Sequence, residues 1–281
     1  MPRFRLDRFL TLYFFHPLSM RRGAAENRVA ILMYHGIGDL QKDGRHPYFE
    51  TATSSRVFAT QMAFLRANGY RVAGLNDFLG VLSDREADAG KCVVITFDDG
   101  LADFKTHALP ILESCGFSCT VFLPAGLIGK TINGRACMTW SQVRDAAAVG
   151  TVFGSHSLTH PKLSELGPNE MDLEVRCSKE KIEYELGKNI DAFSCPYAFP
   201  EMGERFRKFY QELLEKCGYQ FGVTTNIGNA MSMDNPYLLK RLPVNDHDDT
   251  RFFQAKLEGG YNWLHIFQKA FKRAKRLARA R

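Results

Sequence analysis

The sequence predicts an α/β fold in which parallel strands alternate with helices. Short apolar runs bounded by turn residues recur along the chain, and segments with helical spacing of apolar residues lie between them. The chain has 281 residues, of which 45% are hydrophobic, so it is long enough for one barrel-sized domain with a large core. Strands that alternate with helices form a parallel sheet or barrel.

The expected elements follow in chain order. A helix is expected to begin at Ser54 or Ser55, which can cap it, and to stop at Gly69; another is expected to begin at Pro168, a residue suited to a first helical turn. Pro110 can kink the helix that contains it. The expected strands are 29–35, 92–97, 118–123, 151–154, 192–196, 221–225 and 239–244, and the expected helices are 54–68, 76–82, 103–114, 140–149, 168–186 and 204–217.

The positive charge is concentrated at the end of the chain. The net charge is +6, and residues 262–281 carry seven Lys or Arg and no acidic residue. The rest is near neutral, which argues against a nucleic-acid partner. Apolar residues at helical spacing among these basic residues are typical of a helix on an anionic membrane surface, although a helix packed on the domain or a solubilising tail fits too. We expect an arm at 1–28, a domain at 29–261 and a basic amphipathic helix at 262–281.

The N-terminal arm is basic and aromatic. Its apolar run, residues 9–15, is short and is interrupted by His16 and Pro17, and Arg21 and Arg22 follow it, so it makes a poor signal peptide. An interfacial segment or an arm that covers the domain fits better. The seven cysteines are an odd number in mostly apolar surroundings, which is typical of a reducing compartment. We therefore expect a cytoplasmic protein, peripheral at the inner face of the membrane.

Two motifs follow predicted strands and carry the candidate chemistry. Asp98 and Asp99 stand at the end of an apolar run, before Gly100, and His156 and His160 lie four residues apart further along. Adjacent like charges favour a metal or cation beside one of them. One helical turn would place both imidazoles on one face, within reach of one ion. Two histidines and one carboxylate are a common catalytic zinc set.

These motifs resemble those of the NodB-type polysaccharide deacetylase family. The segment 96–100 reads Thr-Phe-Asp-Asp-Gly, as in the first family motif, and 156–160 matches the second, His-Ser-x-x-His. Residues 32–35 resemble the opening strand, 195–197 the third motif and 241–244 the last strand in one branch of the family. The resemblance runs from about residue 29 to 260 in family order.

The resemblance implies a distorted (β/α) barrel of about seven parallel strands. It also implies a hydrolase that removes N-acetyl groups from an amino sugar of a surface polysaccharide or a lipid-linked saccharide precursor. Asp99, His156 and His160 would bind a divalent metal, usually zinc, and Asp98 would be the base that activates metal-bound water. The backbone N–H of Tyr197 would stabilise the oxyanion, and Trp140 would form part of the pocket wall.

The sequence departs from the family pattern at two places. Ser194 stands where the third motif commonly has an arginine that orients the base, and the late general-acid histidine has no clear match. His35, at the end of the first strand, is the candidate to line the pocket, and either His35 or His247 could be the acid. A deformylase or small-amide hydrolase on the same fold, or a non-catalytic sugar-binding relative in envelope assembly, are the alternatives.

Overall fold

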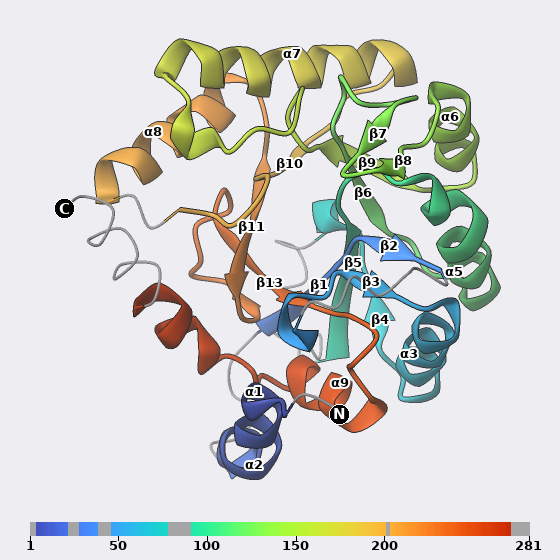
Figure 1. The fold of residues 1–281 in the computed structure, drawn as a ribbon, viewed down its shortest axis with the longest axis vertical. Helices are drawn as coiled ribbons and strands as arrows, with labels where there is room; N and C mark the ends of the chain where they lie inside the picture. The colour runs from blue at the N-terminus through green and yellow to red at the C-terminus, as the bar shows by residue number, and fades with distance from the viewer. Residues whose placement is uncertain (1–3, 22–27, 39–45, 78–90, 201–202, 271–281) are drawn as a thin grey trace.

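The computed structural model describes residues 4–21, 28–38, 46–77, 91–200 and 203–270. Its centre is a closed barrel of parallel strands, which confirms the predicted fold (Figure 1). The barrel closes because the first strand pairs in parallel with two others, one from each half of the chain. In order around the barrel the seven strands are β1 (Arg28–Tyr34), β5 (Cys92–Phe97), β6 (Thr120–Leu123), β9 (Val152–Ser155), β10 (Ala192–Ser194), β11 (Phe221–Ile227) and β13 (Leu239–Pro243).

Short strands decorate the barrel. Two of them pair with barrel strands, and the other four form two small separate sheets. They are β2 (Gly36–Ile37), β3 (Ala52–Thr53), β4 (Arg71–Val72), β7 (Thr131–Ile132), β8 (Arg135–Ala136) and β12 (Ala230–Met231).

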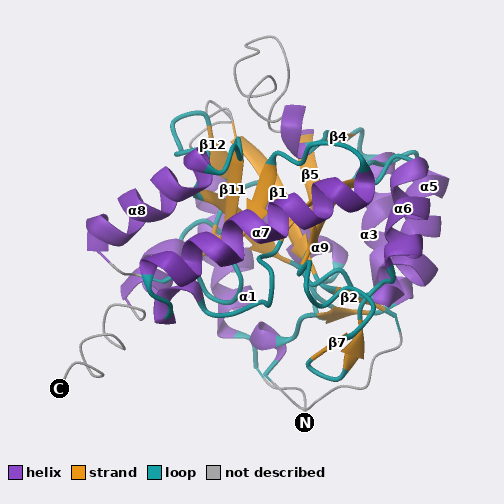
Figure 2. Ribbon diagram, turned by 90° about the horizontal axis from the view of Figure 1, so that it is seen from above, coloured by secondary structure: helices purple, strands orange, loops and turns teal. Residues whose placement is uncertain are grey.

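Helices surround the barrel on its outside (Figures 1 and 2). The helix that begins after Ser54 does so because the Ser54 hydroxyl accepts a hydrogen bond from the N–H of Val57. The long helix that begins at Pro168 ends at Gly187, whose φ of 66° is the left-handed conformation that glycine adopts readily. The helices are α3 (Ser55–Ala67), α5 (Leu109–Cys115), α6 (Trp140–Ala148), α7 (Pro168–Leu186), α8 (Gly203–Lys216) and α9 (Thr250–Leu257).

Two expected helices differ from those observed, and one observed helix was not expected. The helix expected at 76–82 is represented by one 3₁₀ turn, Leu75–Asp77, and the rest of it lies outside the described residues. The helix expected at 103–114 begins with a π-helical stretch, Phe104–Ala108, which places Pro110 in the first turn of α5, where its missing N–H costs little. The sequence did not predict α9, although Asp249 caps it by accepting from the N–H of Phe252.

The N-terminal arm folds as a helix on the outside of α9 (Figure 1). It comprises α1 (Leu6–Leu10), a π-helical turn (Thr11–Phe15) and α2 (His16–Arg21). Residues 264–270 at the other end of the chain are also helical, whereas the remainder of the predicted basic helix lies outside the described residues. Across the described part of the chain, none of the helices combines the length and apolar character needed to cross a bilayer.

Alternation along the strands decides which side chains face the barrel interior. Val29 and Ile31 of β1 belong to a small apolar cluster with Val94, Val223 and Leu239, whereas the intervening residues of β1 belong to the larger core shared with the helices. The small cluster fills the barrel. Inward positions nearer the carboxyl ends of the strands carry polar side chains instead, and they build the site.

Candidate active site

Four inward positions at the carboxyl ends of the strands hold Asp98, His156, Ser194 and Arg241. Each follows an inward residue by two positions, as the strand period requires: Asp98 follows Thr96 beyond β5, and Arg241 follows Leu239 within β13. All four are at least 98% buried. Since parallel strands share one carboxyl edge, residues 143 positions apart in the sequence meet here.

The turns that leave these strands have unusual backbone conformations. The φ angles of Asp99, Ser157, His160 and Tyr197 are 71°, 64°, 59° and 57°, in the left-handed region that residues other than glycine seldom adopt. Strained residues of this kind cluster at functional sites. The spacing of His156 and His160 predicted that one helical turn joins them, and this prediction was wrong. An irregular turn brings the two imidazoles together instead. In this turn the Ser157 hydroxyl accepts a hydrogen bond from the N–H of His160 at 3.0 Å.

Asp99, His156 and His160 form a cluster of three possible metal ligands. Their donor atoms all lie within 4.8 Å of one another. The Nε2 atoms of His156 and His160 lie 3.5 and 3.4 Å from Oδ1 of Asp99. Burial opposes ionisation of Asp99, but hydrogen bonds with the two imidazoles outweigh it and hold the pKa of Asp99 well below its usual range.

The chemistry of this donor set fits a divalent metal ion. His156 Nδ1 lies 2.8 Å from the carbonyl oxygen of Ser194, so this nitrogen carries the proton and donates it. When a metal ion replaces the proton that Nε2 shares with Asp99, the Nε2 lone pair becomes the ligand; a backbone acceptor behind a metal-binding histidine is the usual arrangement in metalloproteins. Two imidazoles and one carboxylate are a typical set for catalytic zinc and related ions.

Asp98 has a different partner from Asp99. The Arg241 guanidinium donates to both carboxylate oxygens of Asp98, with Nη1–Oδ1 and Nη2–Oδ2 distances of 2.8 and 2.7 Å. The Ser194 hydroxyl lies 3.2 Å from Oδ1 of Asp98 and donates to it. Burial raises the pKa of this carboxyl, but the charge of Arg241 outweighs burial and lowers the pKa of Asp98 to about 2. Asp98 is therefore ionised and fixed in orientation.

Every donor of the buried Arg241 guanidinium has an acceptor. Besides its bonds to Asp98, it donates to the carbonyl oxygen of Thr224 (3.0 Å), to the hydroxyl of Thr96 (3.2 Å) and to that of Ser194 (3.0 Å). Five N–H groups thus meet five acceptors, which is what a fully buried guanidinium requires. An arginine of the last barrel strand thus pairs with Asp98, although the third motif itself has serine in place of arginine.

Sequence reasoning placed Arg241 in the last strand but gave it no role. The signal was an arginine at a position whose parity, shared with Leu239, faces the barrel interior. A charged residue at such a position needs a buried partner of opposite charge. The sequence could not show which of the acidic residues that partner is.

The remaining candidates lie in different surroundings, and interactions with the cluster are seen for Tyr197 and His35. The half-exposed ring of Tyr197 has its centroid 4.7 Å from that of His160. His35 directly follows β1, and burial lowers the pKa of its imidazole although Asp98 and Asp99 act in the opposite direction. Trp140 begins α6, packs against the main core and lies 5.9 Å from Nζ of Lys181. His247 lies in the loop before α9, where its N–H donates to Asn245.

Comparison with known proteins shows where this fold and site recur. The model of the polysaccharide deacetylase family matches residues 85–222. YxkH of Bacillus subtilis (strain 168), which bears a polysaccharide deacetylase name, is 30% identical over 235 residues, covering 82% of this chain and 76% of its own. The poly-β-1,6-N-acetyl-D-glucosamine N-deacetylase of Escherichia coli (strain K12) is 30% identical over 139 residues, which are 43% of this chain but 19% of that protein.

Solved structures share the barrel. The deacetylase PplD of Streptococcus pyogenes, in complex with acetate, superposes with a TM-score of 0.72 at 24% identity over 83% of this chain and 99% of its own. IcaB of Ammonifex degensii gives 0.67 at 22% identity over 83% and 97% of the two chains.

Fold and similarity together define a hydrolase of carbon–nitrogen bonds. The chain belongs to the polysaccharide deacetylase family, and it is a carbohydrate N-deacetylase. Members of this family are generally metal-dependent, in agreement with the cluster of Asp99, His156 and His160. The family match ends at residue 222, before Arg241, so the partner of Asp98 lies outside the matched region.

Proposed function

We propose that this enzyme removes the N-acetyl group of an amino sugar in a surface polysaccharide or its lipid-linked precursor. Asp99, His156 and His160 hold a divalent metal ion, zinc in the first instance, and Asp98 is the general base. The proposal is supported by the different partners of the two adjacent carboxylates, Asp98 and Asp99. Asp99 faces two imidazoles, whereas both oxygens of Asp98 are held by Arg241.

A bound divalent ion polarises an acyl carbonyl and lowers the pKa of water beside it. Asp98, kept ionised by Arg241, accepts the proton of the attacking water. A low pKa makes Asp98 a weak base in bulk solution, but its fixed orientation removes the entropic cost of finding the water. The backbone N–H of Tyr197 stabilises the negative charge that develops on the acyl oxygen. His35 lines the pocket beside these groups.

The proton held on Asp98 then passes to the leaving amine of the sugar. The carbon–nitrogen bond breaks, and acetate and a free amino sugar are released. Ser194 keeps Asp98 in place through both steps, since its hydroxyl bonds to both partners of the ion pair. Trp140 and Tyr197 form apolar walls for the sugar rings.

Metal content tests the ligand assignment. Asp99→Asn, His156→Ala and His160→Ala should each lower the metal-to-protein ratio measured by elemental analysis, whereas His107→Ala, at an exposed histidine, should leave it unchanged. Asp98→Asn should keep nearly all its metal and lower turnover by about 10² or more. Loss of metal in Asp98→Asn with retention in Asp99→Asn would reverse the two roles.

Acetate release tests the substrate. We expect release from N-acetylated lipid-linked saccharides and from free oligomers of N-acetylglucosamine, the sugar named for the Escherichia coli relative. All seven cysteines are free thiols, which suits a cytoplasmic protein and a lipid-linked or nucleotide-linked substrate. Release of acetate from O-acetylated but not from N-acetylated sugars would refute the proposal.

A further inference from the structure

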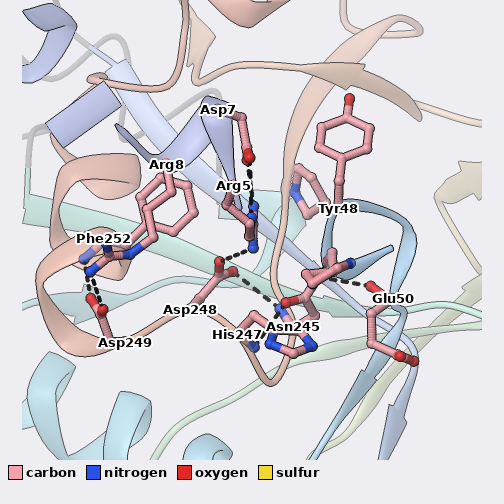
Figure 3. A network of polar contacts seen from close by, with 12 residues as sticks. Arg5, Asp7, Arg8, Tyr48, Glu50, Asn245, His247, Asp248, Asp249 and Phe252 are labelled. Atoms are coloured by element: carbon pink, nitrogen blue, oxygen red, sulfur yellow. Dashed lines mark hydrogen bonds and ion pairs between the residues drawn. The ribbon is translucent and has the colours of Figure 1, made fainter. Parts of the chain in front are cut away.

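The N-terminal helix, residues 4–21, turns its polar side chains toward the barrel. Arg5 pairs with Asp248 in the loop after β13, and Asp7 pairs with Arg5 and accepts from the hydroxyl of Tyr261 at 2.8 Å. Figure 3 shows Arg5 between Asp7 and Asp248, and Arg8 beside Asp249. The charge of Arg5 outweighs the burial of Asp7 and lowers the pKa of that carboxyl. This end of the helix is thus fixed by buried ion pairs.

The rest of the helix is held by a hydrogen bond, a stacked ring pair and a contact between His16 and Glu258. The hydroxyl of Thr11 accepts from Nε1 of Trp263 at 3.0 Å, and the ring of Phe15 stacks on Trp263 at 4.6 Å. His16 Nε2 lies 2.6 Å from a carboxylate oxygen of Glu258. The helix therefore lies along the side of the barrel, from the loop after β13 to the turn after α9.

The opposite side of this helix is entirely apolar and faces solvent. Among residues 4–20, whose exposure the structure describes, every exposed residue is hydrophobic or proline, with exposed fractions of 40–71% for the large hydrophobic ones. Phe9 lies at the centre, with its ring 6.0 Å from Phe4, 5.1 Å from Tyr13 and 6.0 Å from Phe14. We call this surface the aromatic face; it consists of Phe4, Leu6, Phe9, Tyr13, Phe14, Leu18 and Met20.

A surface helix of a soluble enzyme usually buries its apolar side and exposes its polar side, whereas this helix exposes its aromatic face. Single exposed apolar residues are common, but a contiguous row of them indicates a surface that is covered in use. The aromatic face continues toward the C-terminal helix, since Trp263 contacts Phe15 on one side and Phe267 on the other, and Ile266 and Phe267 are 70% and 60% exposed.

The charge around the aromatic face is positive. In the sequence, residues 1–25 contain five arginines and one acidic residue, Asp7; in the structure Arg5 and Asp7 are turned inward and paired, and Arg8 pairs with Asp249. The guanidinium of Arg251 lies 5.3 Å from the centre of the Tyr13 ring, and Lys269 follows Phe267 by two positions. In the sequence, residues 262–281 contain seven Lys or Arg and no acidic residue.

We propose that the aromatic face is a docking surface for an anionic lipid membrane. Exposed aromatic and aliphatic side chains on one side of a helix, bordered by Arg251 and Lys269 and by Arg8 in its ion pair with Asp249, match the interfacial zone of a bilayer. Arginines near anionic lipid headgroups each add attraction, about 1 kcal/mol per basic residue. A second copy of the chain fits less well, because it would bring the same positive border against itself.

Docking in this way would place the barrel with its side against the lipid. The Phe4 end of the aromatic face lies beside the loop that follows β13, the strand that carries Arg241. The carboxyl edge of the barrel, where the catalytic groups lie, would then be close to the membrane surface. This arrangement holds whatever the substrate, and binding to lipid can be measured without turnover.

Vesicle sedimentation tests the proposal. The full chain is mixed with vesicles of phosphatidylcholine and phosphatidylglycerol, and with phosphatidylcholine alone, at low and high salt. We expect binding to the anionic vesicles that weakens as salt rises. Phe9→Asn together with Phe14→Asn should weaken it about tenfold or more, because two phenyl rings no longer leave water. The matched control is Tyr184→Asn with Met233→Asn, at residues 86% and 85% exposed outside the aromatic face; it should bind like the wild type.

Melting temperature and metal content establish that each variant is folded. Absence of binding by the wild type, or equal binding by the Phe9 and Phe14 double variant, would overturn the proposal. So would a dimer in solution, measured by light scattering, that this double variant dissociates, because a second copy would then be the occupant. Purified protein that begins near Ala24 would overturn it too, since such a chain lacks the helix.

Discussion

Replacing Arg241 with methionine should remove the ion pair that keeps Asp98 ionised and in place. Methionine has a similar length and no charge, so Arg241→Met leaves the Asp98 carboxylate buried without the two hydrogen bonds it accepts at 2.8 and 2.7 Å. Burial then dominates, and the pKa of Asp98 rises from about 2. We expect both stability and turnover to fall.

The expected loss of unfolding free energy follows from the pKa of Asp98 and from the burial of its ion pair with Arg241. A carboxyl with a pKa of about 2 in the folded protein and about 3.9 in the unfolded chain stabilises the fold by about 2.6 kcal/mol at neutral pH. Breaking a buried ion pair by removing one partner commonly costs about 3–5 kcal/mol. The unfolding free energy of Arg241→Met should therefore fall by about 3–5 kcal/mol, and turnover by about 10² or more.

Urea unfolding of four proteins provides the assay: the wild type, Arg241→Met, Asp98→Asn and the double variant. The double variant should be more stable than the two single losses predict together, because it buries no uncompensated charge. It should nonetheless stay inactive. Arg241→Lys, which keeps the charge but not the planar pair of hydrogen bonds, should lie between wild type and Arg241→Met. An Arg241→Met protein with wild-type turnover and stability within about 0.5 kcal/mol would refute this reasoning.

Three further results are expected. The pKa of Asp98 is lower in the folded than in the unfolded state, so the stabilisation from this carboxylate is complete above about pH 4 and is lost as the pH falls through about 2. The difference in unfolding free energy between the wild type and the Arg241→Met/Asp98→Asn double variant should therefore shrink between about pH 4 and about pH 2. A constant difference over this range would contradict the prediction. Gly222→Ala would put a Cβ 2.3 Å from the backbone oxygen of Tyr237, so the free energy of unfolding in urea should fall by about 1–3 kcal/mol. An unchanged urea midpoint would contradict this prediction. Tyr197→Ala keeps the backbone N–H but removes the ring beside His160, so steady-state kinetics should show a higher KM with little change in kcat; a hundredfold drop in kcat would assign the ring a chemical role.

Elements with strong local signals could be predicted from the sequence. The strand at 92–97 and the helix at 168–186 have the predicted bounds, since the first is wholly apolar before its motif and the second has proline at its start and glycine after its end. The grouping of Asp99 with the two histidines was also predicted, but through a helical turn that does not exist. Spacing identified the partners without identifying the backbone that joins them.

What the sequence could not give depends on contacts between distant segments. The N-terminal helix contacts the rest of the protein through Arg5, Asp7 and Thr11, so the pattern of its apolar residues does not reveal which side of the helix packs. Asp248, the partner of Arg5, lies 243 residues further along the chain. The role of Arg241 likewise requires the barrel to be closed. Local propensity and periodicity carry no information about such pairings.

Closure of the barrel by its first and last strands has a consequence for the nascent enzyme. The three family motifs end at Tyr197, whereas Arg241 lies in the final barrel strand, which pairs with both β1 and β11. A ribosome-bound or truncated chain can therefore contain every motif residue and still lack the arginine that keeps Asp98 ionised. On the proposed mechanism, hydrolysis therefore requires a chain in which the first and last barrel strands have paired.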